Sequence, residues 1–249
     1  MSRKRFFVSP EGIREGVALL PPDQAHHLRH VLRLQPESAV EVFDGQGRGY
    51  CGVVEFAGSA VRVVSLRSLP SRGGTAPFLT LGMALIKADR MEMVLQKGTE
   101  LGADEFVPLI SRHCSVRVQD RKLQERIRRW ERIVREAAKQ CRRLTLPAVG
   151  APIEFERFVA ERTRPGFEGF LWHEKAAVPW RAAPPATGQV GLCIGPEGGW
   201  DPSEVSLAES AGWKIFRLGD TILRAETAAI AAVALFRFSL PAQGPSGSG

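Results

Sequence analysis

Two loops in the C-terminal third of the chain carry the residues best suited to hold a small ligand. The first loop consists of Gly195, Pro196, Glu197, Gly198 and Gly199, and the second runs from Leu218 to Thr227. Each loop follows a short apolar run typical of a buried strand and precedes a helical pattern. Because ligands of open α/β sheets bind where such strands end, we expect a ligand site at this edge of the sheet.

The first loop offers bare backbone rather than charge. It lacks the Lys-Ser/Thr pair of a triphosphate-binding loop and the spacing of a dinucleotide-binding loop. Its glycines let main-chain N–H and C=O groups approach a ligand closely, which suits a purine edge. The residues that follow predict a helix start, with Asp201 as N-cap, Pro202 at the first helical position and Glu204 closing a capping box. We therefore predict a nucleoside-like ligand and a structural role for Glu204.

The second loop combines apolar and charged side chains. Ile222 and Leu223 are suited to contact a purine ring, and Arg224 follows them directly. A buried or half-buried arginine needs an anionic partner, which here is Glu226, a carboxylate of the ligand or the substrate. Thr227 is expected to open an alanine-rich helix over 228–236, whose small residues permit close packing.

Composition adds a polyanionic partner to this ligand site. The chain has 249 residues, a net charge of +7 and an isoelectric point near 9.7. These values favour nucleic acid or an acidic membrane surface as partner. No apolar run approaches the roughly 20 residues that cross a bilayer, and the apolar run after Arg5 stops at Ser9. We therefore expect a soluble cytoplasmic protein that has no signal peptide and does not bind a membrane.

Metal binding is not expected. The four cysteines form no CxxC pair, and no Cys/His cluster has the spacing of a zinc site. The four cysteines are interpreted as reduced thiols. His26 and His30 could share one helix face, but no third ligand accompanies them.

The segment 112–143 concentrates the positive charge. It holds twelve Lys or Arg against four Asp or Glu, so its net charge of +8 exceeds that of the whole chain. Its apolar residues recur at spacings of four and three, which predicts a helix over about 123–143. We favour contact with RNA phosphates over a merely solvated face carrying pairs such as Glu125/Arg129. The candidates are Arg112, Arg129, Arg142 and Arg143.

A second basic group lies near the N-terminus. A helix is predicted over about 23–34, with a polar face that suits RNA contact as well as it suits plain surface. The RNA-binding candidates are Arg3, Arg5, His27, Arg29 and His30.

The chain pattern predicts two domains. Residues 1–72 contain three short strands, at 40–43, 50–56 and 61–66, separated by hairpin signals, which suggests a small β-barrel. After a Pro/Gly/Ser-rich linker at 69–77, strands at 78–86, 106–110, 170–172, 190–194 and 215–218 alternate with helices at 90–101 and 123–143. This alternation predicts an α/β domain with a mostly parallel sheet over 73–240. The tail, 241–249, is expected to be disordered.

These residues carry a family resemblance that covers nearly the whole chain. The motifs are HHLRHVLRL at 26–34, FDG at 43–45, Lys87, Arg90 and Glu92, TELG at 99–102, IGPEGG at 194–199, LG at 218–219 and ILRAETA at 222–228. In this order they resemble the RsmE family, the bacterial small-subunit rRNA uracil-N3 methyltransferases of the SPOUT superfamily. One departure is Thr221, which stands where the family often has arginine.

The resemblance implies a PUA-like RNA-binding barrel followed by a SPOUT domain with a deep trefoil knot. It implies a homodimer that uses S-adenosylmethionine to methylate N3 of a uridine of 16S rRNA, near the decoding region of the small ribosomal subunit. A third knot segment is expected near the end of the 170–172 strand. The cofactor-binding candidates are Leu171, His173, Ile194, Gly195, Pro196, Glu197, Gly198, Gly199, Leu218, Gly219, Ile222, Leu223 and Thr227.

For catalysis we assign Arg224 and Glu226. Arg224 would stabilise negative charge on the uracil oxygens and so lower the pKa of N3. Glu226 would act as the base or, as we favour, orient Arg224. Two other functions stay open: a non-catalytic RNA-binding or ribosome-assembly factor, and a tRNA methyltransferase on the same fold.

Overall fold

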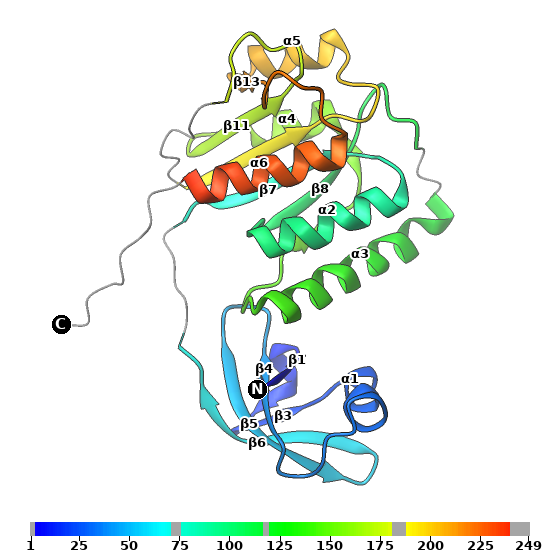
Figure 1. The fold of residues 1–249 in the computed structure, drawn as a ribbon, viewed down its shortest axis with the longest axis vertical. Helices are drawn as coiled ribbons and strands as arrows, with labels where there is room; N and C mark the ends of the chain where they lie inside the picture. The colour runs from blue at the N-terminus through cyan, green and yellow to red at the C-terminus, as the bar shows by residue number, and fades with distance from the viewer. Residues whose placement is uncertain (1–2, 71–75, 117–119, 181–187, 240–249) are drawn as a thin grey trace, which may run out of the picture. The chain divides into compact units, whose positions relative to one another are not determined.

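A computed structural model of the chain describes residues 3–70, 76–116, 120–180 and 188–239 (Figure 1). The contacts divide the chain into two units: Met1–Gly73 with Arg135–Leu146, and Gly74–Val134 with Pro147–Gly249. The segment 135–146, which we predicted as part of the second domain, thus packs with the first unit. The predicted tail, 241–249, lies outside the described residues.

The first unit is built on a six-stranded sheet in the order β1-β4-β5-β6-β3-β2. The β1–β4 pair is parallel and the other pairs are antiparallel. The sheet and its first helix enclose an apolar core that includes Phe6, Leu28, Val42 and Val63. The strands are β1 (Lys4–Phe7), β2 (Ile13–Arg14), β3 (Val17–Leu19), β4 (Ala39–Phe43), β5 (Gly49–Ala57) and β6 (Ala60–Ser68).

The helix predicted over 23–34 is shorter and less regular than expected. A 3-10 turn, η1 (Pro10–Gly12), precedes it, and the helix itself starts as α1 (Pro22–His26) with proline at its first position. It continues as a π-helical turn, η2 (His27–Val31), and Arg33 takes a positive φ of 50°. The chain therefore leaves the helix before Leu34, after Leu28 has been buried in the core.

The second unit has a sheet of seven strands, all parallel, which confirms the predicted α/β class. The order is β10-β8-β7-β12-β11-β13, and β9 pairs with β8. The strands are β7 (Phe78–Ala84), β8 (Glu105–Ile110), β9 (Ala148–Val149), β10 (Ile153–Glu154), β11 (Phe167–Trp172), β12 (Gln189–Ile194) and β13 (Lys214–Phe216).

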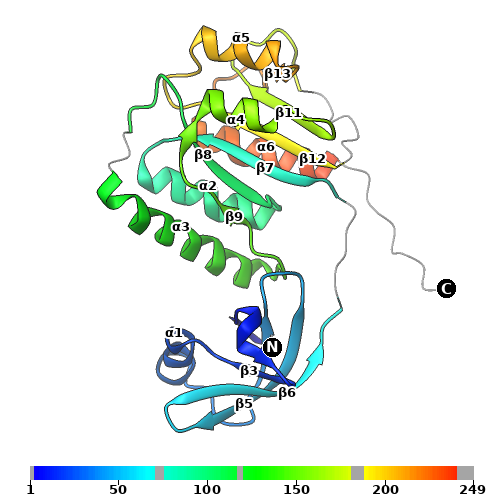
Figure 2. The ribbon, with the colours of Figure 1, turned by 180° about the vertical axis from the view of Figure 1, so that it is seen from behind.

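Helices cover both faces of this sheet (Figure 2). On one face α2 (Ala88–Leu101), α6 (Ala225–Ser239) and the part of α3 (Asp120–Cys141) before Arg135 share one core cluster. On the other face α4 (Phe155–Arg162) and α5 (Pro202–Ser210) share a second cluster. α4, β9 and β10 were not predicted from the sequence, because each is too short to show a clear periodicity.

The last helix is tied to the beginning of the domain. Arg237 of α6 donates to the carbonyl oxygens of Gly102 and Pro77 and pairs with Asp104. The alanines of α6 permit its close contact with α2, as predicted. The trefoil knot stays a prediction from the resemblance. Within the described ranges, no helix has the length and apolar character needed to span a membrane.

Candidate functional site

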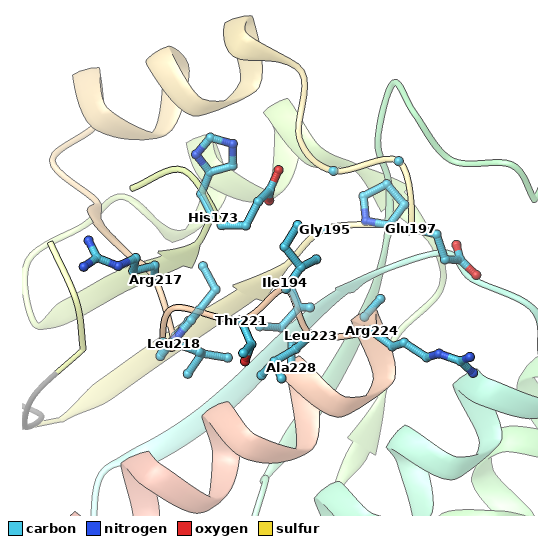
Figure 3. Close-up of a pocket in the computed structure, with 18 of the residues that line it drawn as sticks. His173, Ile194, Gly195, Glu197, Arg217, Leu218, Thr221, Leu223, Arg224 and Ala228 are labelled. Atoms are coloured by element: carbon cyan, nitrogen blue, oxygen red, sulfur yellow. The ribbon is translucent and has the colours of Figure 1, made fainter. Parts of the chain in front are cut away.

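A pocket of about 580 Å³ lies where β11, β12 and β13 end. Its walls are the segments 172–174, 194–199 and 217–228 (Figure 3). Arg90 of α2 also lines it. The volume is typical of a small-molecule site. The two glycine loops predicted from the sequence therefore do meet in one pocket, at the carboxyl edge of a parallel sheet.

The first wall follows directly from β11. Trp172, His173 and Glu174 line the pocket, so the cofactor-binding candidate His173 lies at it. The side chain of Leu171, our other candidate here, is fully buried in the cluster on the opposite face of the sheet. Neighbouring residues of a strand point to opposite faces, so Leu171 and Trp172 cannot both face the pocket with their side chains.

The first glycine loop, 195–199, is held firmly in place. The Gly199 N–H donates to the Pro196 carbonyl at 2.9 Å, and Gly199 has a φ of 73°, which favours glycine. A Cβ on Gly195 would lie 3.1 Å from the Trp200 indole nitrogen, so this glycine is needed for close packing. Trp200 in turn donates to the carbonyl of Trp172 at 3.0 Å, which links the first two walls.

The predicted capping box at the start of α5 is confirmed. The Asp201 side chain accepts from the Ser203 N–H, and Glu204 accepts from the Asp201 N–H, each at 2.9 Å. Glu204 also accepts from the Arg112 N–H at 3.1 Å, which ties α5 to the segment after β8. Burial raises the pKa of Glu204, and the hydrogen bonds from Ser203 lower the pKa of Asp201. Glu204 therefore has the structural role that we predicted.

The second loop is far more open. Ile222 is 85% exposed although it is apolar, and Leu223 and Arg224 are exposed beside it. All three line the pocket, as do Leu218 and Gly219. Figure 3 shows Arg217 and Arg224 at opposite sides of the pocket.

The prediction for Thr227 needs a correction. The final helix starts at Ala225 rather than at Thr227. Thr227 is exposed and is not among the residues that line the pocket, so its part in cofactor binding stays a prediction. Ala225 and Ala228 face the pocket instead, as the helical spacing of three requires.

The buried carboxylate of Glu226 does not orient Arg224 through an ion pair. Its ion-pair partner is Arg90 of α2, whose Nε lies 3.8 Å from Glu226 Oε1. Arg90 Nη1 also donates to Glu197 Oε1 at 3.1 Å. Arg224 has no ion pair within the part of the chain that the structure describes. Sequence reasoning missed the role of Arg90, although Arg90 is among the residues that carry the family resemblance.

Several of the basic candidates in the first unit have structural partners. Arg5 is only 9% exposed, lies over the Phe43 ring at 4.4 Å and donates to the Arg143 carbonyl. Burial lowers the pKa of Arg5. Arg142 makes two hydrogen bonds to Glu41, at 2.6 and 2.8 Å. A hollow of about 350 Å³ nonetheless gathers cations, and its lining includes Arg3, Lys4, Arg5, His27, Lys139 and Arg142.

The remaining candidates are spread more widely. Arg29 donates to the carbonyls of Gly58 and Ala60, and His30 lies 4.6 Å from the His26 ring, centroid to centroid. In the second unit, Arg129 pairs with Glu92 of α2 at 2.8 Å rather than with Glu125, and this hydrogen bond raises the pKa of Arg129. The Arg112 side chain is exposed, 3.8 Å from Glu156.

Comparisons with known proteins identify the family of the chain. Residues 75–237 match the model of an RNA methyltransferase domain, and residues 20–59 match that of an RNA methyltransferase PUA domain. The ribosomal RNA small subunit methyltransferase E of Synechocystis sp. is 36% identical, over 92% of this chain and 76% of that protein. The protein of the same name from Mycobacterium bovis is 34% identical, over 92% and 88%.

Solved structures of two methyltransferases superpose on nearly the whole chain. The ribosomal RNA small subunit methyltransferase E of Neisseria gonorrhoeae, bound to S-adenosyl methionine, superposes with a TM-score of 0.85 at 29% identity. A methyltransferase from Legionella pneumophila, also in complex with S-adenosyl methionine, superposes with a TM-score of 0.82 at 29% identity. Both alignments cover 94% of this chain and 96% of the other.

Proposed function

The chain belongs to the ribosomal RNA small subunit methyltransferase E family, and from this premise we propose that it methylates N3 of a uridine in 16S rRNA with S-adenosylmethionine as methyl donor. The observation that carries the proposal is the pocket formed by the two glycine loops and the end of β11. Its volume, its bare backbone at 195–199 and its apolar residues at 222–223 fit a nucleoside. Its side chains of both charge signs fit the amino-acid part of the same ligand.

When bound, S-adenosylmethionine supplies a methyl group that is activated by its sulfonium. The loops of the chain hold and orient the reactants, which contributes much of the rate acceleration in such transfers. Arg224 stabilises the negative charge that develops on the uracil oxygens as N3 loses its proton. Its exposed guanidinium is available to a substrate because no ion pair occupies it within the described residues.

RNA binding is assigned to the basic residues of both units. The cationic hollow of the first unit and the exposed Arg112 and Arg129 of the second supply the positive charge that phosphates need. RNA affinity should therefore fall steeply with salt concentration. A flat salt profile would count against these contacts.

The active form is proposed to be a homodimer in the cytoplasm. Apolar side chains are exposed on the adjacent helices α2 and α6, namely Met93, Leu235 and Phe238. A homodimer interface over these two helices would cover these apolar side chains. Light scattering should give twice the mass of one chain, and a monomeric mass would refute the dimer.

The function is tested by mapping methylation in cells that lack the gene. Reverse-transcription stops and mass spectrometry of 16S rRNA should show the loss of one N3-methyluridine, which returns with the wild-type gene. Loss of a tRNA methylation instead would establish the tRNA alternative. Calorimetry with S-adenosylmethionine tests the non-catalytic alternative, since a vestigial pocket would give no binding heat.

A further inference from the structure

We propose that Glu226 is a positioning residue that acts on the first glycine loop through Arg90, so that Glu226, Arg90 and Glu197 form a charge clamp across the pocket wall. The inference rests on the proposed function for the identity of the cofactor. It replaces the sequence-based roles of Glu226 as a base or as the partner of Arg224.

The clamp joins three segments that are far apart in the sequence. Arg90 is on the first turn of α2, Glu197 is in the first glycine loop and Glu226 is on the first turn of α6. The guanidinium presents Nη1 to Glu197 at 3.1 Å and Nε to Glu226 at 3.8 Å. One planar cation thus holds two carboxylates from two different elements, a geometry that arginine permits and lysine does not.

Glu226 is the buried end of the clamp. It is 7% exposed, and its Oε2 is buried without a hydrogen-bond partner among the described residues. The start of a helix favours a negative charge there, but a buried carboxylate still needs a cation. Among the described residues, Arg90 is the cation that forms an ion pair with it.

The exposed end of the clamp lies at the pocket. Arg90 and Glu197 both line the pocket, whereas Glu226 lies behind them. When Glu226 is neutralised, Arg90 loses its buried anchor and holds Glu197 less firmly. The loop 195–199 then samples more conformations, so that cofactor affinity should fall while the chemical step, carried by other residues, is retained.

The test is a set of isosteric variants. Arg90→Gln, Glu226→Gln and the double variant are compared for S-adenosylmethionine affinity by calorimetry and for kcat at saturating cofactor. Glu226→Gln should weaken binding roughly five- to tenfold, the effect of one partly exposed charge-assisted contact, and leave kcat within about twofold. Arg90→Gln should weaken it more, because it leaves the Glu226 carboxylate buried without a partner.

The double variant decides between a clamp and two independent residues. If Arg90 and Glu226 act together, Arg90→Gln/Glu226→Gln should bind the cofactor at least as well as Arg90→Gln alone, since the second change removes the unpaired charge. If the loss of cofactor affinity in the double variant equals the product of the losses in the two single variants, the proposal is overturned. The S-adenosylmethionine affinity of Arg90→Lys should lie between those of the wild type and Arg90→Gln.

Hydrogen exchange separates this inference from the proposed function. In protein without added cofactor, the amides of 195–199 should exchange faster in Glu226→Gln than in wild type, and unchanged exchange would refute the clamp. A wild-type protein that binds no S-adenosylmethionine would refute the function, while the exchange result would still decide the clamp. The control is Lys97→Gln on the same helix, whose ion pair with Glu100 at 3.0 Å lies outside the pocket lining and whose loss should change neither measurement.

Discussion

The two glycine loops of the pocket lie side by side but differ in how they are held. The first packs Gly195 against Trp200, closes a turn at Gly199 and reaches Arg90 through Glu197. The second exposes Ile222, Leu223 and Arg224. The first loop is therefore a preformed wall, whereas the side chains of the second loop remain exposed beside the pocket.

Because of this difference, we expect mutations in the two loops to have different effects. Changes in the first loop should alter folding stability and cofactor affinity together, because its residues are packed in the free protein. Changes in the second loop should alter cofactor affinity or turnover but not folding stability, because its side chains contribute little to the folded state.

The largest expected effect is that of Arg224→Gln in the second loop. It should lower kcat about 100-fold by removing charge stabilisation from the reacting base. Unfolding free energy should stay within about 0.5 kcal/mol of wild type. Single-turnover methyl transfer and urea unfolding measure the two quantities. Full turnover with unchanged cofactor affinity would remove Arg224 from the mechanism.

A matched pair of glycines tests the comparison directly. Gly195→Ala places a Cβ 3.1 Å from the Trp200 indole nitrogen and should cost about 2 kcal/mol of unfolding free energy through overpacking. Gly219→Ala meets no atom within 4 Å and should cost less than about 0.5 kcal/mol. Urea unfolding measures the loss of unfolding free energy in both variants. Equal losses would show that the two loops are equally constrained.

Trp200→Phe should have a smaller effect, about 1.5 kcal/mol of unfolding free energy. It removes the hydrogen bond to the Trp172 carbonyl and leaves that buried oxygen without its donor. Because Trp172 lines the pocket, cofactor affinity should also fall. Thermal unfolding and calorimetry on the same sample test whether this hydrogen bond supports both stability and cofactor affinity. A variant with unchanged stability and unchanged affinity would argue against that role.

The smallest effect is the pH dependence of the helix cap. Hydrogen bonds from Ser203 lower the pKa of Asp201 in the folded protein. The carboxylate therefore stabilises the fold above its unfolded pKa of about 3.9, and this contribution is lost as pH falls through the lower folded value. Asp201→Asn should lower the melting temperature slightly at pH 7, and the difference should vanish near pH 2. A difference that persists there would have another cause.

The sequence allowed the elements of the pocket to be predicted better than its contacts. Apolar runs before Gly195 and Leu218 place two loops at one sheet edge, and the capping box at Asp201 follows from residue types alone. The ion pair between Arg90 and Glu226 depends on the packing of α2 against α6, which no local pattern encodes.

Two cofactor-binding candidates, Leu171 and Thr227, are not among the residues that line the pocket, for simple geometric reasons. Leu171 and Trp172 are both apolar in a buried strand, so composition does not tell which of them faces the pocket. Thr227 was expected to open the final helix, but the helix starts two residues earlier, at Ala225. The bulged turn at His27–Val31 likewise has no clear sequence signal.

The hydrogen bonds of Arg237 join the last helix to residues that are synthesised earlier. Domains form from the N-terminal side as a chain is synthesised. The third wall of the pocket, 217–228, and the helix that Arg237 fastens to Gly102 and Pro77 emerge after the sheet strands that they must join. The pocket is thus completed by a part of the chain that is synthesised after its first two walls, and a nascent chain ending before residue 217 lacks the third wall.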